Sequence, residues 1–211
     1  MMAGLMRPDR IALFPLNVVL VPGEHLPLHI FEPRYRRMVQ ECLATDRPFG
    51  MLLAQKDGIV RVGCSAEIEL VTKRYDDGRM DILTVGRQPF RVVELSQDDP
   101  LLEGNVDYLE DRELVIDERT QERLMGLYET CYTLVFSDLP PKLDSSLSGS
   151  LSYSVAAALP LNLMWKQTLL ELRSEEERRG RLVRYLSEWA LHLQKLGAVR
   201  KRSAGNGHNV N

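Results

Sequence analysis

His25 and His29 are the residues of this chain whose types and spacing come nearest to a metal site. They lie four positions apart, with Pro27 between them. On a helix such a pair could bind one Zn²⁺, but Pro27 disfavours a helix and favours an extended segment. In a strand their backbones would stand roughly 13 Å apart, which is too far for one zinc ion with bonds of about 2 Å. We therefore expect hydrogen-bonded histidines in a sheet and no metal site.

Motifs of common catalytic sites are missing from the sequence. It contains no G-x-x-x-x-G-K-[ST] loop, no G-x-G-x-x-G after a strand, no G-x-S-x-G and no S-x-x-K. The serine-rich stretch 145–154 has no histidine or lysine near it, since none lies between Lys142 and Lys166. Glu67 and Glu69 stand on the polar side of an expected strand and need no acid–base role. The sequence therefore predicts no catalytic residue and no cofactor.

The composition excludes several classes of protein. The 211 residues include 44% hydrophobic and 27% charged residues, and no apolar run reaches the length of a membrane span. The formal net charge is −3, and residues 1–113 hold 14 Lys+Arg against 19 Asp+Glu. This acidic first half disfavours nucleic acid. Three widely spaced cysteines make a disulfide framework improbable, so we expect a reducing, cytoplasmic location.

The first half of the chain has the pattern of short strands interrupted by one helix. Pro22-Gly23 and Asp77-Gly78 mark turns, the second typical of a hairpin. Pro33 suits the first turn of a helix over 33–43, whose apolar residues recur every three or four positions. Strands are expected over 11–14, 18–21, 26–30, 49–55, 65–75, 80–85, 90–95 and 104–109.

The second half has the pattern of helices. One helix ends before Pro140-Pro141, and a second runs through the serine-rich stretch to Pro160. Asn162 should cap the third, and Ser174 with Glu177 should form a capping box for the fourth, which Gly197 should end. We therefore divide the chain into a strand-rich unit over 10–113, a helical unit over 114–197 and a disordered tail over 198–211.

Read in order, the turn and apolar residues resemble a known family. The longest matching segment, LPLHIFEPRYR at 26–36, is specific because such a string rarely arises by chance. Over residues 10–195 the chain resembles the N-terminal, substrate-binding domain of Lon protease. The other matching positions are 13–16 (LFPL), 22–23 (PG), 48–50 (PFG), Gly63, Ala66, Ile68, 77–79 (DGR), Gly86, 90–92 (FRV), 159–161 (LPL), 166–167 (KQ), 169–171 (LLE), Arg178 and Leu182.

This resemblance implies a fold and a class of function. The fold would be α+β, with an N-terminal PUA-like β-barrel that carries an inserted helix, followed by a C-terminal helical bundle. The best-known members continue into an ATPase and a Ser-Lys peptidase, so the chain resembles a stand-alone, non-catalytic module. The family's domain is associated with unfolded or extended polypeptides and with self-association. The implied partners are therefore such polypeptides, a second copy or a full-length protease for which the chain is an adaptor in protein quality control.

Four residues where the barrel meets its helix are the predicted polypeptide-binding residues: Phe31, Glu32, Arg34 and Tyr35. We expect part of this cluster to line or support a groove between barrel and bundle, where an extended segment could also add to a sheet edge. A purely structural interpretation stays open, in which Phe31 and Tyr35 are buried and Glu32 pairs with Arg34. The alternatives are a PUA-like RNA-binding module, and a small enzyme, which would need a deep pocket with convergent polar groups.

Overall fold

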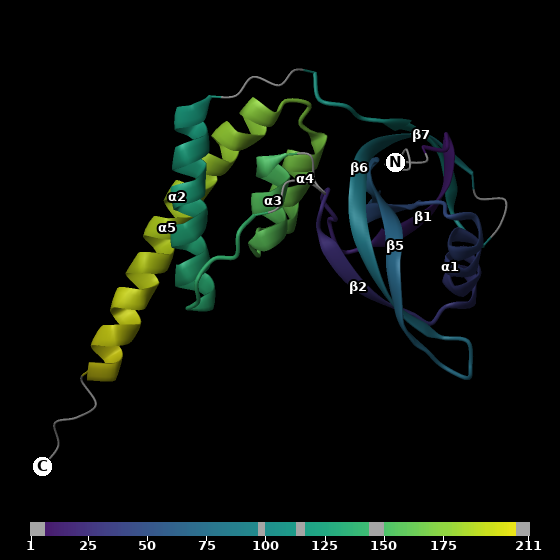
Figure 1. The fold of residues 1–211 in the computed structure, drawn as a ribbon, viewed down its shortest axis with the longest axis horizontal. Coiled ribbons are helices and arrows are strands. Elements are labelled where there is room, and N and C mark those ends of the chain that lie inside the picture. Colours follow the sequence, from purple (N-terminus) through teal and green to yellow (C-terminus); the bar gives the residue numbers. More distant parts are fainter. Residues whose placement is uncertain (1–6, 97–99, 113–116, 144–149, 206–211) are drawn as a thin grey trace, which may run out of the picture.

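The computed structural model describes residues 7–96, 100–112, 117–143 and 150–205. Figure 1 shows a sheet with α1 on one side and the other four helices on the opposite side. We call residues 7–112 the sheet lobe and residues 117–205 the helical lobe. The strands are β1 (Arg10–Leu16), β2 (His25–Ile30), β3 (Phe49–Gln55), β4 (Gly58–Ile59), β5 (Val62–Arg74), β6 (Met80–Ser96) and β7 (Glu103–Tyr108). The helices are α1 (Pro33–Thr45), α2 (Glu118–Phe136), α3 (Leu151–Ala158), α4 (Leu163–Glu171) and α5 (Glu175–Gly205).

The α+β class predicted from the sequence is confirmed, with a mostly antiparallel sheet. The strand order is β1-β7-β6-β5-β3-β4, and β1 also pairs in parallel with β3. The path from β1 through β7, β6, β5 and β3 therefore returns to β1. The sheet is nonetheless not a simple barrel, because β2 lies off this path and pairs with β6.

The predicted hairpin joins β5 to β6. Gly78 adopts a φ of 84°, which glycine tolerates without a steric penalty, and its amide donates to Tyr75 O at 2.9 Å. The two strands predicted over 80–85 and 90–95 form the single long strand β6. Gly86 lies in the middle of β6 because the backbone of the β1–β2 connection crosses there. A Cβ on Gly86 would stand 2.2 Å from Val21 O.

One predicted strand is absent. Residues 18–21 form an irregular connection, although Val19, Leu20 and Val21 are buried in the core. Backbone amides of this connection form hydrogen bonds without a strand ladder. The Val21 amide donates to Glu24 Oε2 at 3.1 Å, and the Gly23 amide donates to Gly86 O of β6 at 2.8 Å. Apolar composition therefore indicated burial here, and the expectation of a strand was wrong. Pro15 lies within β1 and does not divide it.

The helices of the second half begin largely where their caps predict. Asn162 Oδ1 accepts from the Met164 amide at 2.9 Å at the start of α4, and Ser174 Oγ accepts from the Glu177 amide at 3.3 Å at the start of α5. Gly197 does not end α5, which continues to Gly205. A glycine inside an exposed helix costs only about 1 kcal/mol, so it need not stop one. The tail expected over 198–211 is therefore helical to Gly205, and residues 206–211 lie outside the described part.

A hydrophobic core runs through both lobes. Leu161 and Leu169 of the helical lobe belong to the same buried cluster as Val62 and Cys64 of β5. Within the helical lobe, α2 and α3 both pack against α5. Among the described helices, none combines the length and apolar character needed to cross a membrane.

Candidate functional site

The structure brings the four predicted site residues together at the turn from β2 into α1, but they differ in their exposure to solvent. Phe31 is 59% exposed, whereas Tyr35 is only 6% exposed and packs on Phe14 with ring centroids 4.1 Å apart. Burial raises the pKa of Tyr35, with the nearby Arg34 guanidinium opposing the rise. Phe31 is thus an exposed aromatic side chain on the junction between β2 and α1, and the buried Tyr35 anchors this junction in the core.

Glu32 and Arg34 form an ion pair beside that exposed ring. The Arg34 Nε donates to Glu32 Oε2 at 2.9 Å, and the Arg34 guanidinium carbon lies 4.5 Å from the centre of the Tyr35 ring. Together with Pro33, Arg37 and Pro100 they line an open depression of about 510 Å³. Charge and apolar surface therefore meet at this junction, and Tyr35 supports it from below.

The predicted residues do not line the groove between the two lobes. Their depression is bordered by the β2–α1 turn and Pro100, and no described residue of α2 to α5 contributes to it. Helix α1 lies on the side of the sheet that faces away from the helical lobe (Figure 1). The expectation placed the four residues wrongly because β2 begins next to the helical lobe and ends at α1, so its last residues are carried away from the interlobe groove.

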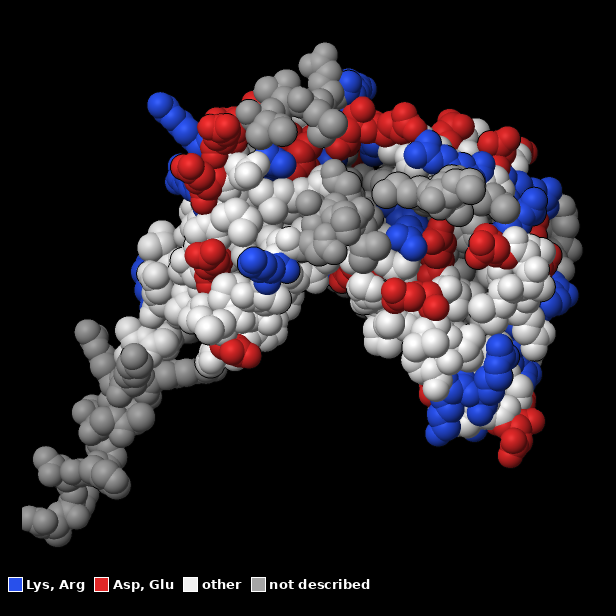
Figure 2. Space-filling model, viewed as in Figure 1, with Lys and Arg blue, Asp and Glu red and all other residues white. Residues whose placement is uncertain are grey.

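A groove between the lobes does exist, lined by other residues. Figure 2 shows the molecule hollowed between its two lobes. There a depression of about 330 Å³ has Glu24 and His25 on one side and Lys142, Ser154 and Ala157 on the other. The sequence predicted a groove between the lobes but not the residues that line it, because its two walls are more than 100 residues apart in the chain.

Glu24 and Lys166 form a partly buried ion pair across the lobes at this groove. Lys166 Nζ donates to Glu24 Oε1 at 2.5 Å, and the two side chains are 10% and 15% exposed. Burial raises the pKa of Glu24, while the charge and hydrogen bond of Lys166 oppose the rise. Gln167, the next residue, donates to Val62 O at 3.1 Å. These contacts hold α4 against the sheet and are not arranged as an acid–base pair around a free cavity.

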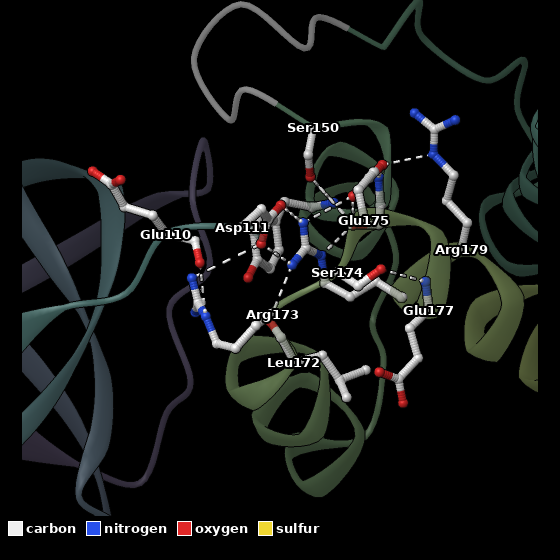
Figure 3. A network of polar contacts seen from close by, with 12 residues as sticks. Glu110, Asp111, Ser150, Leu172, Arg173, Ser174, Glu175, Glu177 and Arg179 are labelled. Carbon is white, nitrogen blue, oxygen red and sulfur yellow. Dashed lines mark hydrogen bonds and ion pairs between the residues drawn. The ribbon is translucent and has the colours of Figure 1, made fainter. Parts of the chain in front are cut away.

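A larger polar network also joins the two lobes (Figure 3). Arg178 of α5 is completely buried, and its Nη1 donates to Asp111 Oδ1 at 2.7 Å and to Leu172 O at 3.0 Å. Its Nη2 reaches Glu175 Oε2 at 3.0 Å. Burial raises the pKa of Glu175, but hydrogen bonds from Ser152 and the neighbouring arginines outweigh it, and the net pKa is lowered. The spacing of Glu175 and Arg178, three apart at a helix start, is a sequence signal that could have revealed this network.

The histidines are paired separately, as sheet residues. His25 Nε2 lies 3.1 Å from Glu69 Oε2, and His29 Nδ1 lies 2.5 Å from Asp81 Oδ1. The part of the chain that the structure describes contains no group of three metal-ligating side chains. The geometry therefore offers no metal centre within the described ranges.

The three cysteines are free, buried thiols. Burial raises the pKa of Cys42 to about 11 and that of Cys131 to about 11, and it raises the pKa of Cys64 further. A nucleophilic cysteine needs a lowered pKa and some exposure. The cysteines consequently belong to the core and do not form a reactive site.

The free edges of the sheet are poorly suited to accept an added strand. Strand β2 pairs with β6 alone, but Pro27 in its middle has no amide hydrogen to offer. Beyond Ala66, β5 pairs only with β6, and register shifts between Ile68 and Leu70 and between Val71 and Lys73 distort it. Bulges of this kind twist an edge away from an incoming strand. Recognition by side chains is therefore favoured over strand addition.

Comparison with known proteins places the chain in a family. The family model for the ATP-dependent protease La (LON) substrate-binding domain matches residues 10–188. The chain is similar to Lon protease of Escherichia coli (strain K12), with 29% identity over 221 residues that cover 93% of this chain and 28% of that protein. It is similar to the protein cereblon of Xenopus tropicalis, with 34% identity over 105 residues, 47% of this chain and 23% of that protein.

A solved structure agrees with this assignment. The Lon N-terminal domain protein from Xanthomonas campestris superimposes with a TM-score of 0.66 at 25% sequence identity, covering 83% of this chain and 98% of that one. The chain spans about 28% of the length of the Escherichia coli Lon protease that it matches. The family model, the sequence identities and the shared fold lead to one conclusion: the chain belongs to the family of the Lon substrate-binding domain.

Proposed function

We propose that this protein is a non-catalytic module that recognises unfolded or extended polypeptides, with Phe31 as the central contact. Its family is described as the substrate-binding domain of an ATP-dependent protease. The observation that carries the proposal is the exposed ring of Phe31 on a rigid junction. Aromatic side chains in fixed positions contribute strongly to recognition, because little conformational freedom is lost when they bind.

The neighbours of Phe31 fit the same role. The depression lined by Glu32, Arg34 and Arg37 offers both signs of charge beside the ring. Tyr35, below them, stabilises the junction through its contact with Phe14 and does not face the ligand. In this proposal Phe31, Glu32 and Arg34 contact the polypeptide, and Tyr35 is a positioning residue.

Finer features of the architecture belong to the same proposal. The returning strand path supports a PUA-like barrel over residues 10–113, and the packing of α2 and α3 on α5 supports a helical bundle over 114–197. The buried free thiols are compatible with a reducing, cytoplasmic location. A second copy, or a protease for which this chain acts as an adaptor, is the expected protein partner.

Fluorescence anisotropy with labelled, unfolded casein tests the proposed function. We expect saturable binding, and Phe31→Ala should weaken it at least about tenfold, because a phenylalanine ring that becomes buried against the ligand contributes more than about 1.4 kcal/mol. Val93, which is 53% exposed on the far part of β6, supplies the matched control Val93→Ala, expected to bind as the wild type does. Absence of saturable binding up to high micromolar protein would refute the proposal.

A further inference from the structure

The surface next to Phe31 continues onto the β5–β6 hairpin. Lys73 of β5 and His29 of β2 both lie opposite Asp81 of β6, so the three side chains form one row on the same face. Strand residues alternate between the two faces of a sheet. Phe31 follows His29 by two positions and Tyr75 follows Lys73 by two positions, so both lie on the same face as that row. We call this surface the hairpin face; it comprises His29, Phe31, Lys73, Tyr75, Arg79 and Asp81.

The rings of the hairpin face are fixed in place. His29 stacks on Phe31 with centroids 6.0 Å apart and meets the edge of Tyr75 at 5.7 Å. Asp81 holds two of these rings, since it accepts from the Tyr75 hydroxyl at 2.8 Å and pairs with His29 at 2.5 Å. Hydrogen bonds from His29 and Tyr75 lower the pKa of Asp81, which keeps it an ionised acceptor. A ligand therefore meets an ordered surface and loses little free energy in ordering it.

Positive charge gathers on and around this face. Lys73 Nζ lies 4.5 Å from the Tyr75 ring centre, and the guanidinium carbon of Arg79 lies 5.0 Å from it. Arg79 pairs with Asp77 at 2.7 Å. Figure 2 shows Lys and Arg side chains gathered at the lower end of the sheet lobe, where Figure 1 places the hairpin, with Asp and Glu side chains at its tip.

The cations at the hairpin outnumber the carboxylates that neutralise them. Among the described residues, Lys73, Arg74 and Arg36 have no carboxylate partner within 4 Å. Arg36 instead donates to the carbonyl of Asp77, and Arg74 contacts the sulfur of Met80. Lys73 and Arg36 still interact electrostatically with Asp81 and Asp77. With Lys73, Arg74, Arg79 and Arg36 against Asp76, Asp77 and Asp81, a small excess of positive charge lies near the exposed ring of Phe31, in a protein whose formal net charge is −3.

From this complementarity we infer that the hairpin face selects acidic polypeptide segments, in which an apolar or aromatic residue that packs on Phe31 is flanked by Asp or Glu. This inference rests on the proposed function and names its substrate class. Single-stranded RNA is the less suitable ligand, because such binding uses successive bases on several open ring faces. Here Lys73 and Arg79 cover Tyr75, and His29 stacks on Phe31, so the open surface suits one apolar side chain.

Labelled, unstructured peptides that differ only in the residues around one phenylalanine test this inference. Glu, Gln and Lys variants of the flanks would be compared by anisotropy, with an oligouridine of similar length alongside them. We expect the Glu peptide to bind most tightly and the Lys peptide least. Lys73→Gln should weaken binding of the Glu peptide about two- to fivefold, the size of an exposed ion pair. That effect should shrink as salt is added.

Lys56→Gln is the matched control, because Lys56 is an exposed lysine in the β3–β4 turn, away from the hairpin face. It should leave the order of the three peptides unchanged. Equal affinity for the Glu, Gln and Lys peptides, with Phe31→Ala still weakening all three, would overturn this inference and leave the proposed function standing. Tighter binding of oligouridine than of any peptide would overturn the inference in favour of RNA. Absence of binding by casein and all peptides would overturn both.

Discussion

Arg178 in α5 and Asp111 at the end of the sheet lobe form an ion pair whose guanidinium is completely inaccessible to solvent. The same guanidinium lies 4.3 Å from the centre of the Tyr153 ring and donates through its Nε to Ser152 Oγ at 2.9 Å. A buried charge is tolerated only where its hydrogen-bonding capacity is met. Arg178 is therefore a central polar contact of the junction between the lobes, beside the Glu24–Lys166 pair and the shared hydrophobic core.

Replacing Arg178 should destabilise the whole protein. Arg178→Met leaves the carboxylates of Asp111 and Glu175 without their main partner, and breaking a buried pair costs about 3–5 kcal/mol. Urea unfolding at neutral pH measures the loss. Arg181→Met is the control, because Arg181 pairs with Glu177 on the exposed side of the same helix and its loss should cost less than about 0.5 kcal/mol. Similar losses in both variants would contradict this account of the junction.

Lys166→Met should produce a pH-dependent loss of stability. Burial already raises the pKa of Glu24, and losing the opposing lysine should raise it further. A carboxyl whose folded pKa is raised contributes stability below its unfolded pKa, and that contribution is lost as pH rises through the folded value. The deficit of the variant relative to wild type should therefore be larger near pH 8 than near pH 5.

Urea unfolding at the two pH values checks this expectation. The double variant Glu24→Gln with Lys166→Met removes the titrating carboxyl, so its deficit should vary much less between the two values. A deficit of Lys166→Met that is the same at both pH values would show that Lys166 does not oppose the rise in the pKa of Glu24.

Gly86→Ala should be destabilising because the new Cβ would come within 2.2 Å of Val21 O, a backbone atom that cannot move aside cheaply. Overpacking of this kind typically costs about 1–3 kcal/mol. Gly180 in α5 is the matched position, since a Cβ added there would meet no heavy atom within 4 Å and alanine favours a helix. Gly180→Ala should raise the free energy of unfolding by about 0.5–1 kcal/mol. Thermal or urea unfolding of both variants would distinguish close packing at Gly86 from a general intolerance of substitution.

Local signals predicted much of the fold. The hairpin at Asp77-Gly78 and the cap at Asn162 follow from interactions within a few residues, and they appear in the structure as expected. The strand predicted over residues 18–21 was wrong, because apolar composition indicates burial and does not distinguish a strand from a buried connection. The prediction that Gly197 ends the last helix was wrong, because a glycine only weakens a helix.

The candidate site shows a different limit. The segment that contains Phe31 stood out in the sequence, but its position relative to the helical lobe depends on where β2 begins and ends in the sheet. The interlobe contacts of Glu24 with Lys166 and of Asp111 with Arg178 join residues that are 142 and 67 positions apart. No pattern within either segment specifies its distant partner.

The central claim, that polypeptides bind at Phe31, is tested most directly by site-specific photo-crosslinking. A benzophenone side chain would replace Phe31 in one variant, and in two others it would replace Val93 on the sheet lobe or Lys142 in the interlobe groove. We expect labelled, unfolded casein to be captured at position 31 and excess unlabelled casein to compete with this capture. Capture at position 142 with none at position 31 would contradict the account and place recognition in the groove between the lobes.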